Sequence, residues 1–154
     1  MKRIVPVPAC VAVLGAALGA VLGAAPAAAA EFRAVAEPAV FYDAPTIRGK
    51  KLFVAPKGMP VEVVVTIEGW VKVRDRAGDL MWIERKLVTD KRTVVVSSPT
   101  AQLRDKPDEA ARVLIDAAQD VSLELVEAPA SGWARVRHRD GVTGFVRVGQ
   151  VWGL

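Results

Sequence analysis

The fold is decided by the stretch Gly69-Trp70-Val71-Lys72-Val73-Arg74, because it returns 63 residues later as Gly132-Trp133-Ala134-Arg135-Val136-Arg137. Three other blocks return in the same order, and a single inserted residue separates the offsets. The matched blocks are 39–45 with 101–107, 61–64 with 123–126, and 78–83 with 141–146. Self-similarity at a fixed period indicates a repeated structural unit. We therefore predict two copies of one unit, each of about 60 residues.

Each copy has the pattern of short β-strands. Between Val61 and Ile67 the odd positions are apolar, while Glu62 and Thr66 are polar, and such alternation is typical of a half-buried strand. In both quoted stretches, small apolar residues alternate with Lys and Arg in the same way. Prolines and turn-forming glycines punctuate the remainder and argue against long helices. The predicted fold class is all-β, with each copy closed as a small, tightly bent barrel.

Residues 1–30 have the three parts of a secretory signal peptide. The basic pair Lys2-Arg3 precedes an apolar stretch, and Ala28-Ala29-Ala30 forms a small-residue cleavage site. We predict cleavage after Ala30 and export to the periplasm or the exterior, with no stable membrane insertion afterwards. The alternative is an uncleaved anchor, because the uncharged run is long enough to span a bilayer. Cleavage also removes Cys10, the one cysteine, so we expect packed cores rather than disulfides to stabilise the exported chain.

The exported part is expected to contain two domains, residues 31–89 and residues 93–154, joined by the linker 90–92. A linker this short predicts that the copies touch, and the groove between them is the expected ligand site. The chain of 154 residues carries a net charge of +4, whereas its exported part carries only +2. Such a low charge argues against nucleic acid as a partner. The sequence leaves the oligomeric state open.

Catalytic chemistry is not indicated by the residues of the exported part. His138 is the only histidine, so neither a Cys-His site nor a histidine-rich metal site can be assembled. Its position between two arginines beside a turn is typical of a solvated side chain. Glu62 and Glu124 are expected to point outward from strands, whereas a glycosidase requires two carboxylates across a cleft. We predict that the protein is not an enzyme and uses no metal and no cofactor.

The remaining candidates for function are aromatic. Trp70 and Trp133 fall on the Lys/Arg side of their strands, opposite to the apolar positions. They are interpreted as exposed platforms for a sugar or proline ring, or as covers for the barrel end or the contact between copies. The second interpretation is favoured because small domains rarely leave tryptophan free. Trp82 and Phe145 are expected in the core or at a groove edge, and Trp152 is expected to tether the last strand.

The ordered set of motifs resembles the bacterial SH3 domain (SH3b), present twice. The resemblance rests on Phe41-Tyr42-Asp43-Ala44-Pro45, on the two Gly-Trp stretches, and on the blocks 78–83, 103–107 and 141–146. It covers nearly all of the exported chain and implies two SH3-like barrels in tandem. Bacterial SH3 domains often accompany cell-wall enzymes and are thought to contact peptidoglycan or proteins of the envelope. The resemblance therefore implies a binding or scaffold module.

The candidate ligand site is made of aromatic side chains. The residues assigned to it are Tyr42, Trp70, Trp82, Trp133 and Phe145. Phe41-Tyr42-Asp43 is also similar to a signature of eukaryotic SH3 domains, whose aromatics line a groove for proline-rich peptides. That groove is not expected in this chain, because one matching tripeptide is a weak signal and Arg104 replaces the tyrosine in the second copy. Met81 is a second departure, since the bacterial family often has a glycine at its position.

The expected partner is cell-wall glycan or peptide, or a protein of the envelope. Three functions remain open on the sequence. The first is a cell-envelope binding module that contacts peptidoglycan, and the second is an assembly factor of an envelope complex with no carbohydrate ligand. The third is an enzyme subunit without catalytic residues of its own. Genomic neighbourhood, for example a gene for an amidase or a secretion component, would separate them.

Overall fold

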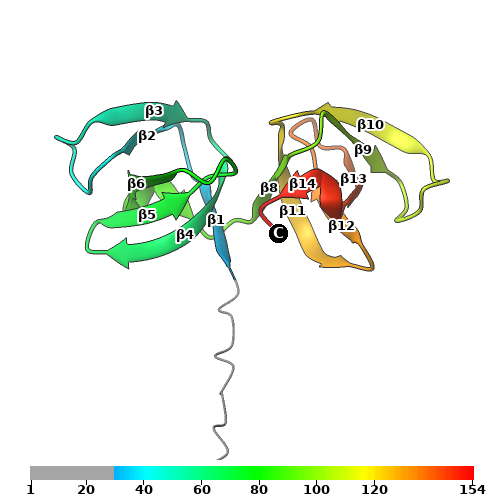
Figure 1. Ribbon diagram of the computed structural model, residues 1–154. Coiled ribbons are helices and arrows are strands. Elements are labelled where there is room, and N and C mark those ends of the chain that lie inside the picture. The colour runs from blue at the N-terminus through cyan, green and yellow to red at the C-terminus, as the bar shows by residue number, and fades with distance from the viewer. Residues whose placement is uncertain (1–29) are drawn as a thin grey trace, which may run out of the picture.

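The computed structural model describes residues 30–154 and consists of two β-sheet units lying side by side (Figure 1). The strands of the first unit are β1 (Glu31–Val35), β2 (Ala39–Tyr42), β3 (Lys51–Ala55), β4 (Pro60–Ile67), β5 (Trp70–Arg74), β6 (Leu80–Glu84) and β7 (Val88–Thr89). Those of the second unit are β8 (Thr93–Val96), β9 (Thr100–Arg104), β10 (Val113–Ala118), β11 (Ser122–Ala130), β12 (Trp133–Arg137), β13 (Thr143–Arg147) and β14 (Val151–Trp152). The predicted signal peptide, apart from Ala30, lies outside the described residues.

The two sheets have the same topology. The strand order is β3-β2-β6-β5-β4-β1-β7 in the first and β10-β9-β13-β12-β11-β8-β14 in the second, so each strand corresponds to the strand seven places later. A single 3-10 turn precedes the last strand of each unit, η1 (Arg85–Leu87) in the first and η2 (Val148–Gln150) in the second. The prediction of an all-β fold with two copies in tandem is confirmed. Within residues 30–154, no helix is long and apolar enough to cross a membrane.

The core of the first unit is formed by every second residue of its strands. Val71 and Val73 of β5 point inward, as do Met81 and Ile83 of β6, and all four side chains are at most 3% exposed. Phe41 of β2 is fully buried among them, and complete burial of such a side chain contributes about 1.5–3 kcal/mol. The residues between them on β5 and β6 therefore face outward.

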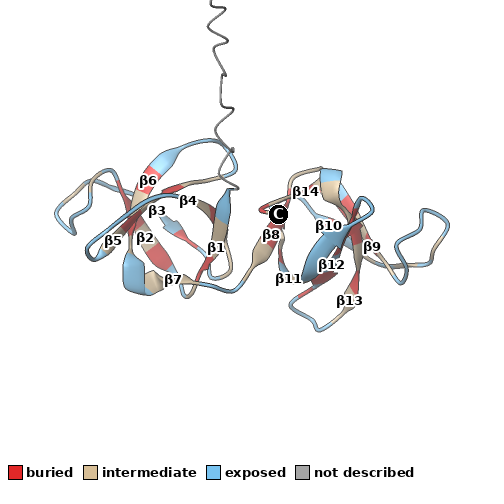
Figure 2. Cartoon of the chain, turned by 90° about the horizontal axis from the view of Figure 1, so that it is seen from below, coloured by how far each residue is buried: buried red, intermediate tan, exposed pale blue. Residues whose placement is uncertain are grey.

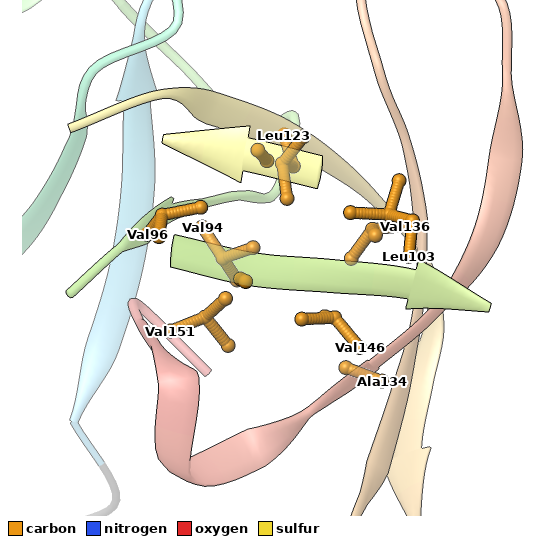
Figure 3. Close-up of a cluster of buried hydrophobic side chains, with 10 residues drawn as sticks. Val94, Val96, Leu103, Leu123, Ala134, Val136, Val146 and Val151 are labelled. Atoms are coloured by element: carbon orange, nitrogen blue, oxygen red, sulfur yellow. The ribbon is translucent and has the colours of Figure 1, made fainter. Parts of the chain in front are cut away.

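The second unit repeats this core with smaller side chains (Figure 3). Ala134 and Val136 take the places of Val71 and Val73, and Val146 takes the place of Ile83. The buried residues that Figure 3 labels are Val94, Val96, Leu103, Leu123, Ala134, Val136, Val146 and Val151. Each unit therefore has a core of its own, and Figure 2 shows the buried residues gathered separately in the two units.

One sequence expectation fails in β4. Its register with β5 shifts between Val63 and Val65, so the two-residue period does not continue through the strand. Beyond this irregularity Val65 and Ile67 are 44% and 40% exposed, although alternation predicted that they would be half-buried. A bulge inserts an unpaired residue, bends the strand and turns the following side chains away. The related strand β11 shows the same kind of shift after Leu125.

The two units touch, as the short linker predicts. The rings of Phe32 in β1 and Trp152 in β14 pack edge to face, with 5.0 Å between their centroids. At another point of the contact Arg76 donates to an oxygen of Asp120 at 2.6 Å. In Figure 1 strands β1, β8 and β14 occupy the middle of the molecule, and the C-terminus lies there too. The first and last strands of the described chain therefore meet at the contact between the units.

Candidate functional site

An aromatic surface covers the outer side of strands β2, β5 and β6 in the first unit. Trp70 and Lys72 are the outward residues of β5, and Trp82 of β6 is paired with Lys72 in the strand register. Tyr42 at the end of β2 is paired with Trp82. Because strand neighbours on one face lie about 5 Å apart, these side chains form one continuous surface. We call Tyr42, Trp70, Lys72 and Trp82 the first aromatic face.

The side chains of the first aromatic face contact one another directly. The rings of Tyr42 and Trp70 pack edge to face at a centroid distance of 5.5 Å, a favoured geometry for aromatic pairs. The ammonium of Lys72 lies 5.8 Å from the centroid of Trp82, within the range of a cation–π interaction. Tyr42 is 7% exposed, whereas Trp70 and Trp82 are half-buried. The two indoles are therefore the accessible part of this face, with the ammonium of Lys72 beside Trp82.

The second unit carries a matching surface at equivalent positions. Trp133 and Arg135 are on β12, and Phe145 of β13 is paired with Arg135 as Trp82 is paired with Lys72. The guanidinium of Arg135 lies 5.9 Å from the centroid of Phe145. We call Trp133, Arg135, Phe145 and Arg147 the second aromatic face. Beside it is a pocket of about 230 Å³, lined by Pro107, Glu127, Ala128, Ala130, Ser131, Trp133, Arg135 and Phe145.

The two faces differ in how the first tryptophan is covered. Arg147 of β13 is paired with Trp133 and places its guanidinium 4.4 Å from the ring centroid, and Trp133 is only 6% exposed. At the equivalent place opposite Trp70 stands Glu84, whose carboxylate pairs instead with Lys86 at 2.9 Å. An acidic group gains nothing from the negative face of an indole, whereas a guanidinium does. Trp70 therefore stays more open than Trp133.

Arg104, at the position of Tyr42, has a different role from the tyrosine. Its guanidinium donates to the carbonyl oxygen of Ala111 at 2.7 Å and to the side chain of Gln102 at 2.6 Å. Its side chain is 16% exposed. These bonds hold the loop between β9 and β10 rather than stacking on Trp133. The replacement that the sequence showed therefore removes one ring from the second aromatic face.

The structure brings the predicted site residues into two groups and not into one. Tyr42, Trp70 and Trp82 lie together, and Trp133 lies with Phe145, each group on its own unit. None of them lines the pockets between the units, where Trp152 is found instead. The expected groove between the copies and the predicted aromatic residues are thus separate surfaces. That these residues bind a ligand remains a prediction.

Sequence reasoning placed Lys72 and Arg135 on the outward face of their strands but did not include them in the ligand site. Lys72 and Arg135 stand two residues after Trp70 and Trp133, so the strand period places each on the face of its tryptophan. That signal was present in the quoted stretches. Arg147 gave no such signal, because its approach to Trp133 depends on the pairing of β12 with β13. A pattern within one strand does not determine which residue of the neighbouring strand lies beside it.

The expectation for His138 is wrong. The residue is 9% exposed, and its Nδ1 lies 3.1 Å from a carboxylate oxygen of Asp140. The backbone amide of His138 donates to the carbonyl of Val142, and His138 also lines a pocket between the two units. In the described part of the chain, no three His, Cys, Asp or Glu side chains gather as a metal site would require.

Two cationic side chains outside the aromatic faces, Arg33 and Lys86, have raised pKa values. The pKa of Arg33 is raised, chiefly because it donates a hydrogen bond to Glu31. The pKa of Lys86 is raised chiefly by its hydrogen bond to Glu84. Both side chains carry their charge at neutral pH already, so neither shift creates a general acid or base there. The arrangement of the two faces is suited to stacking and charge recognition.

Comparison with protein families gives one match that covers most of the chain. The family described as bacterial SH3 domain matches residues 35–90 and again residues 97–153. No curated protein matches the chain.

Solved structures with a related arrangement share little sequence with the chain. NlpC2 from Trichomonas vaginalis is 13% identical, with a TM-score of 0.36 over 80% of this chain and 48% of that one. An NlpC/P60 family protein from Bacillus cereus is 18% identical, with a TM-score of 0.36 over 79% of this chain and 55% of that one. NlpC1 from Trichomonas vaginalis is 11% identical, with a TM-score of 0.38 over 82% and 47%. The chain spans about half the length of these proteins.

Proposed function

Because the chain belongs to the bacterial SH3 domain family and contains the domain twice, we propose that it is a non-catalytic binding module of the cell envelope. Its ligand in this proposal is peptidoglycan, or a partner associated with the cell wall. Export through the predicted signal peptide, with cleavage after Ala30, would deliver it to the periplasm or the exterior. No cofactor takes part in this function.

The observation that carries the proposal is the pairing of an aromatic ring with a cation at the same place in both units. Trp82 lies beside Lys72 and Phe145 lies beside Arg135, in equivalent strand registers. A ring face stacks on the apolar face of a sugar, and a cation attracts the carboxylates of wall peptides. Peptidoglycan offers both groups in a regular order. The aromatic faces therefore match its chemistry better than that of an uncharged polymer.

Two faces on one short chain also suit a polymeric ligand. Each face is small and solvated, so a single contact is expected to be weak. When two sites are joined, the second contact forms at an effective concentration in the millimolar range, and avidity can exceed either affinity by about 10²–10⁴. The linker of three residues holds the two units in contact. Repeated wall units would then be held at two points.

Co-sedimentation with purified sacculi tests this proposal. The variant Trp82→Ala with Phe145→Ala removes one ring from each face, and both side chains are half-buried rather than core. The matched control is Phe53→Ala, which removes a ring that is 40% exposed on β3, outside both faces. The proposal expects the double variant to lose sedimentation while the control keeps it. Equal sedimentation of all three proteins would contradict the assignment of the faces.

An interaction with an envelope protein is the second candidate, and strand β3 favours it. Leu52, Phe53 and Val54 are 42%, 40% and 63% exposed, and β3 lies at the edge of its sheet. An exposed apolar edge is a place where another chain can add a strand. In the second unit the residue equivalent to Val54 is Asp116, which pairs with Gln102 as Val54 pairs with Val40. Absence of sacculus binding together with a specific partner lost on Val54→Asp would favour this function.

A further inference from the structure

A basic cleft lies between the two units, apart from both aromatic faces. Its volume is about 460 Å³, and strands, turns and the linker of both units contribute to it. The residues that line this inter-unit cleft are Ala34, Val35, Ala36, Lys57, Gly58, Thr89, Lys91, Thr93, Ser122, Leu123, Glu124, Arg137, His138, Arg139 and Gly141. Neither unit alone forms it, so it is a property of the tandem arrangement.

The charged side chains of the inter-unit cleft are almost all cationic. Lys57, Lys91, Arg137 and Arg139 face a single carboxylate, that of Glu124. The exported chain as a whole carries only +2, so positive charge is concentrated at this place. The four cations come from three parts of the chain: the loop after β3, the linker, and the hairpin between β12 and β13. The electrostatic potential of these cations is focused inside the cleft, so an anion is attracted there more strongly than to a flat surface of the same charge.

Two of these cations have no partner within the described residues. The carboxylate of Glu124 lies 3.7 Å from Arg137, and Arg139 approaches Asp140 at 4.0 Å. Lys57 and Lys91 form no ion pair with any described side chain, although ion pairs are present elsewhere in both units. Mutual repulsion of cations that share a cleft is relieved when an anion binds between them. Within residues 30–154, Lys57 and Lys91 are therefore the two lining cations that are free to pair with a bound anion.

The floor of the inter-unit cleft strengthens this attraction. Val35 and Leu123, which are each 1% exposed, make the interior of its wall apolar. Charges act more strongly beside a low-dielectric wall than in open water. Thr93 also lines the cleft, and its hydroxyl, which is buried beneath the surface, has no hydrogen-bond partner among the described residues. A buried polar group without a partner is uncommon and often marks a place for water or a ligand.

The geometry points to a binding site for a small multivalent oxyanion, a polycarboxylate or a phosphate, held between Lys57 and Lys91 with the Arg137–Arg139 hairpin. Because the groups come from both units, the anion bridges the units and fixes their relative position. This inference goes beyond the proposed function and does not depend on it. Sugar stacking at the aromatic faces can fail while the anion binds, and the reverse also holds.

Calorimetric titration of the exported chain, residues 31–154, tests the inference with two probes, citrate and inorganic pyrophosphate. Both sheets are complete in this chain. Binding of at least one probe is expected, with affinity that falls as sodium chloride is raised. Binding of citrate alone assigns the site to carboxylates, and binding of pyrophosphate alone assigns it to phosphates. Failure of both probes to bind overturns the inference.

Matched charge variants locate the site. The double variant Lys57→Ala with Lys91→Ala is expected to lower the affinity for the probe about tenfold. Lys50→Ala with Lys51→Ala removes the same charge from an exposed place outside the cleft and is expected to leave the affinity within about twofold. Lys57→Arg with Lys91→Arg keeps the charge and should retain binding. Equal weakening by both alanine pairs would show diffuse attraction and contradict the site.

Discussion

Gly153, next to the C-terminal residue, tests how the two units pack against each other. Gly153 has φ +109°, a conformation that L side chains rarely adopt. A Cβ placed on it would lie 2.9 Å from the carbonyl oxygen of Thr93 and 3.1 Å from the Cβ of Pro60. Thr93 belongs to β8 of the second unit and Pro60 to β4 of the first. Gly153→Ala therefore strains the backbone and crowds the contact between units in a single step.

The expected loss of stability has two parts. A residue held in a disfavoured backbone region costs about 1–3 kcal/mol, and forcing an extra methyl group into a packed place costs about 1–3 kcal/mol. Gly153→Ala should therefore lower the free energy of unfolding by about 2–6 kcal/mol. Gly78 has φ +94°, and a Cβ added there would meet nothing within 4 Å, so Gly78→Ala should show only the backbone part, about 1–3 kcal/mol.

Urea unfolding of residues 31–154, followed by tryptophan fluorescence, measures these differences. Gly149 has neither a positive φ nor a neighbour within 4 Å of an added Cβ, so Gly149→Ala controls for a change near the C-terminus. The account predicts the order Gly153→Ala, then Gly78→Ala, then Gly149→Ala, from the most to the least destabilised. If Gly153→Ala cost no more than Gly149→Ala, the chain end would not lie between the units as described.

Two further substitutions test the surfaces. Arg147→Ala removes the guanidinium that lies 4.4 Å from the Trp133 centroid, so iodide should quench the indole more strongly and stability should fall by about 0.5–1 kcal/mol. Unchanged quenching would refute the stacking. Val54→Asp gives the first unit the residue that the second has as Asp116, and because Val54 is 63% exposed, the unfolding free energy should change by less than about 0.5 kcal/mol. A larger loss in urea unfolding would mean that the outer face of β3 is covered.

Most of the fold could be predicted from the repeat, because the pattern of each short strand is visible in neighbouring residues and occurs in both copies. The alternation of valines with Lys and Arg in the two Gly-Trp stretches correctly placed Trp70 and its cation on the outer side of β5. The pattern failed where geometry departs from a regular strand. At the irregularity between Val63 and Val65 the backbone turns, and apolar residues such as Ile67 come to face water.

The candidate site depended on long-range pairing that the sequence does not specify. Arg147 covers Trp133 because β13 pairs with β12 in one register. His138 is only 9% exposed and lines the cleft between the two units, although its basic neighbours are typical of an exposed turn. The basic inter-unit cleft arises only when the units are placed side by side. Charge counts along the chain therefore gave no indication of it.

Ligand binding by the aromatic faces can be measured with the four tryptophans as separate probes. Trp70, Trp82 and Trp133 lie on the aromatic faces, whereas Trp152 lies at the contact between units. The indole NH resonances of ¹⁵N-labelled protein can be followed while soluble peptidoglycan fragments are added. We expect saturable shifts for the accessible indoles of Trp70 and Trp82 and a stationary signal for Trp152. Shifts confined to Trp152, or no shift at all, would contradict ligand binding by the aromatic faces.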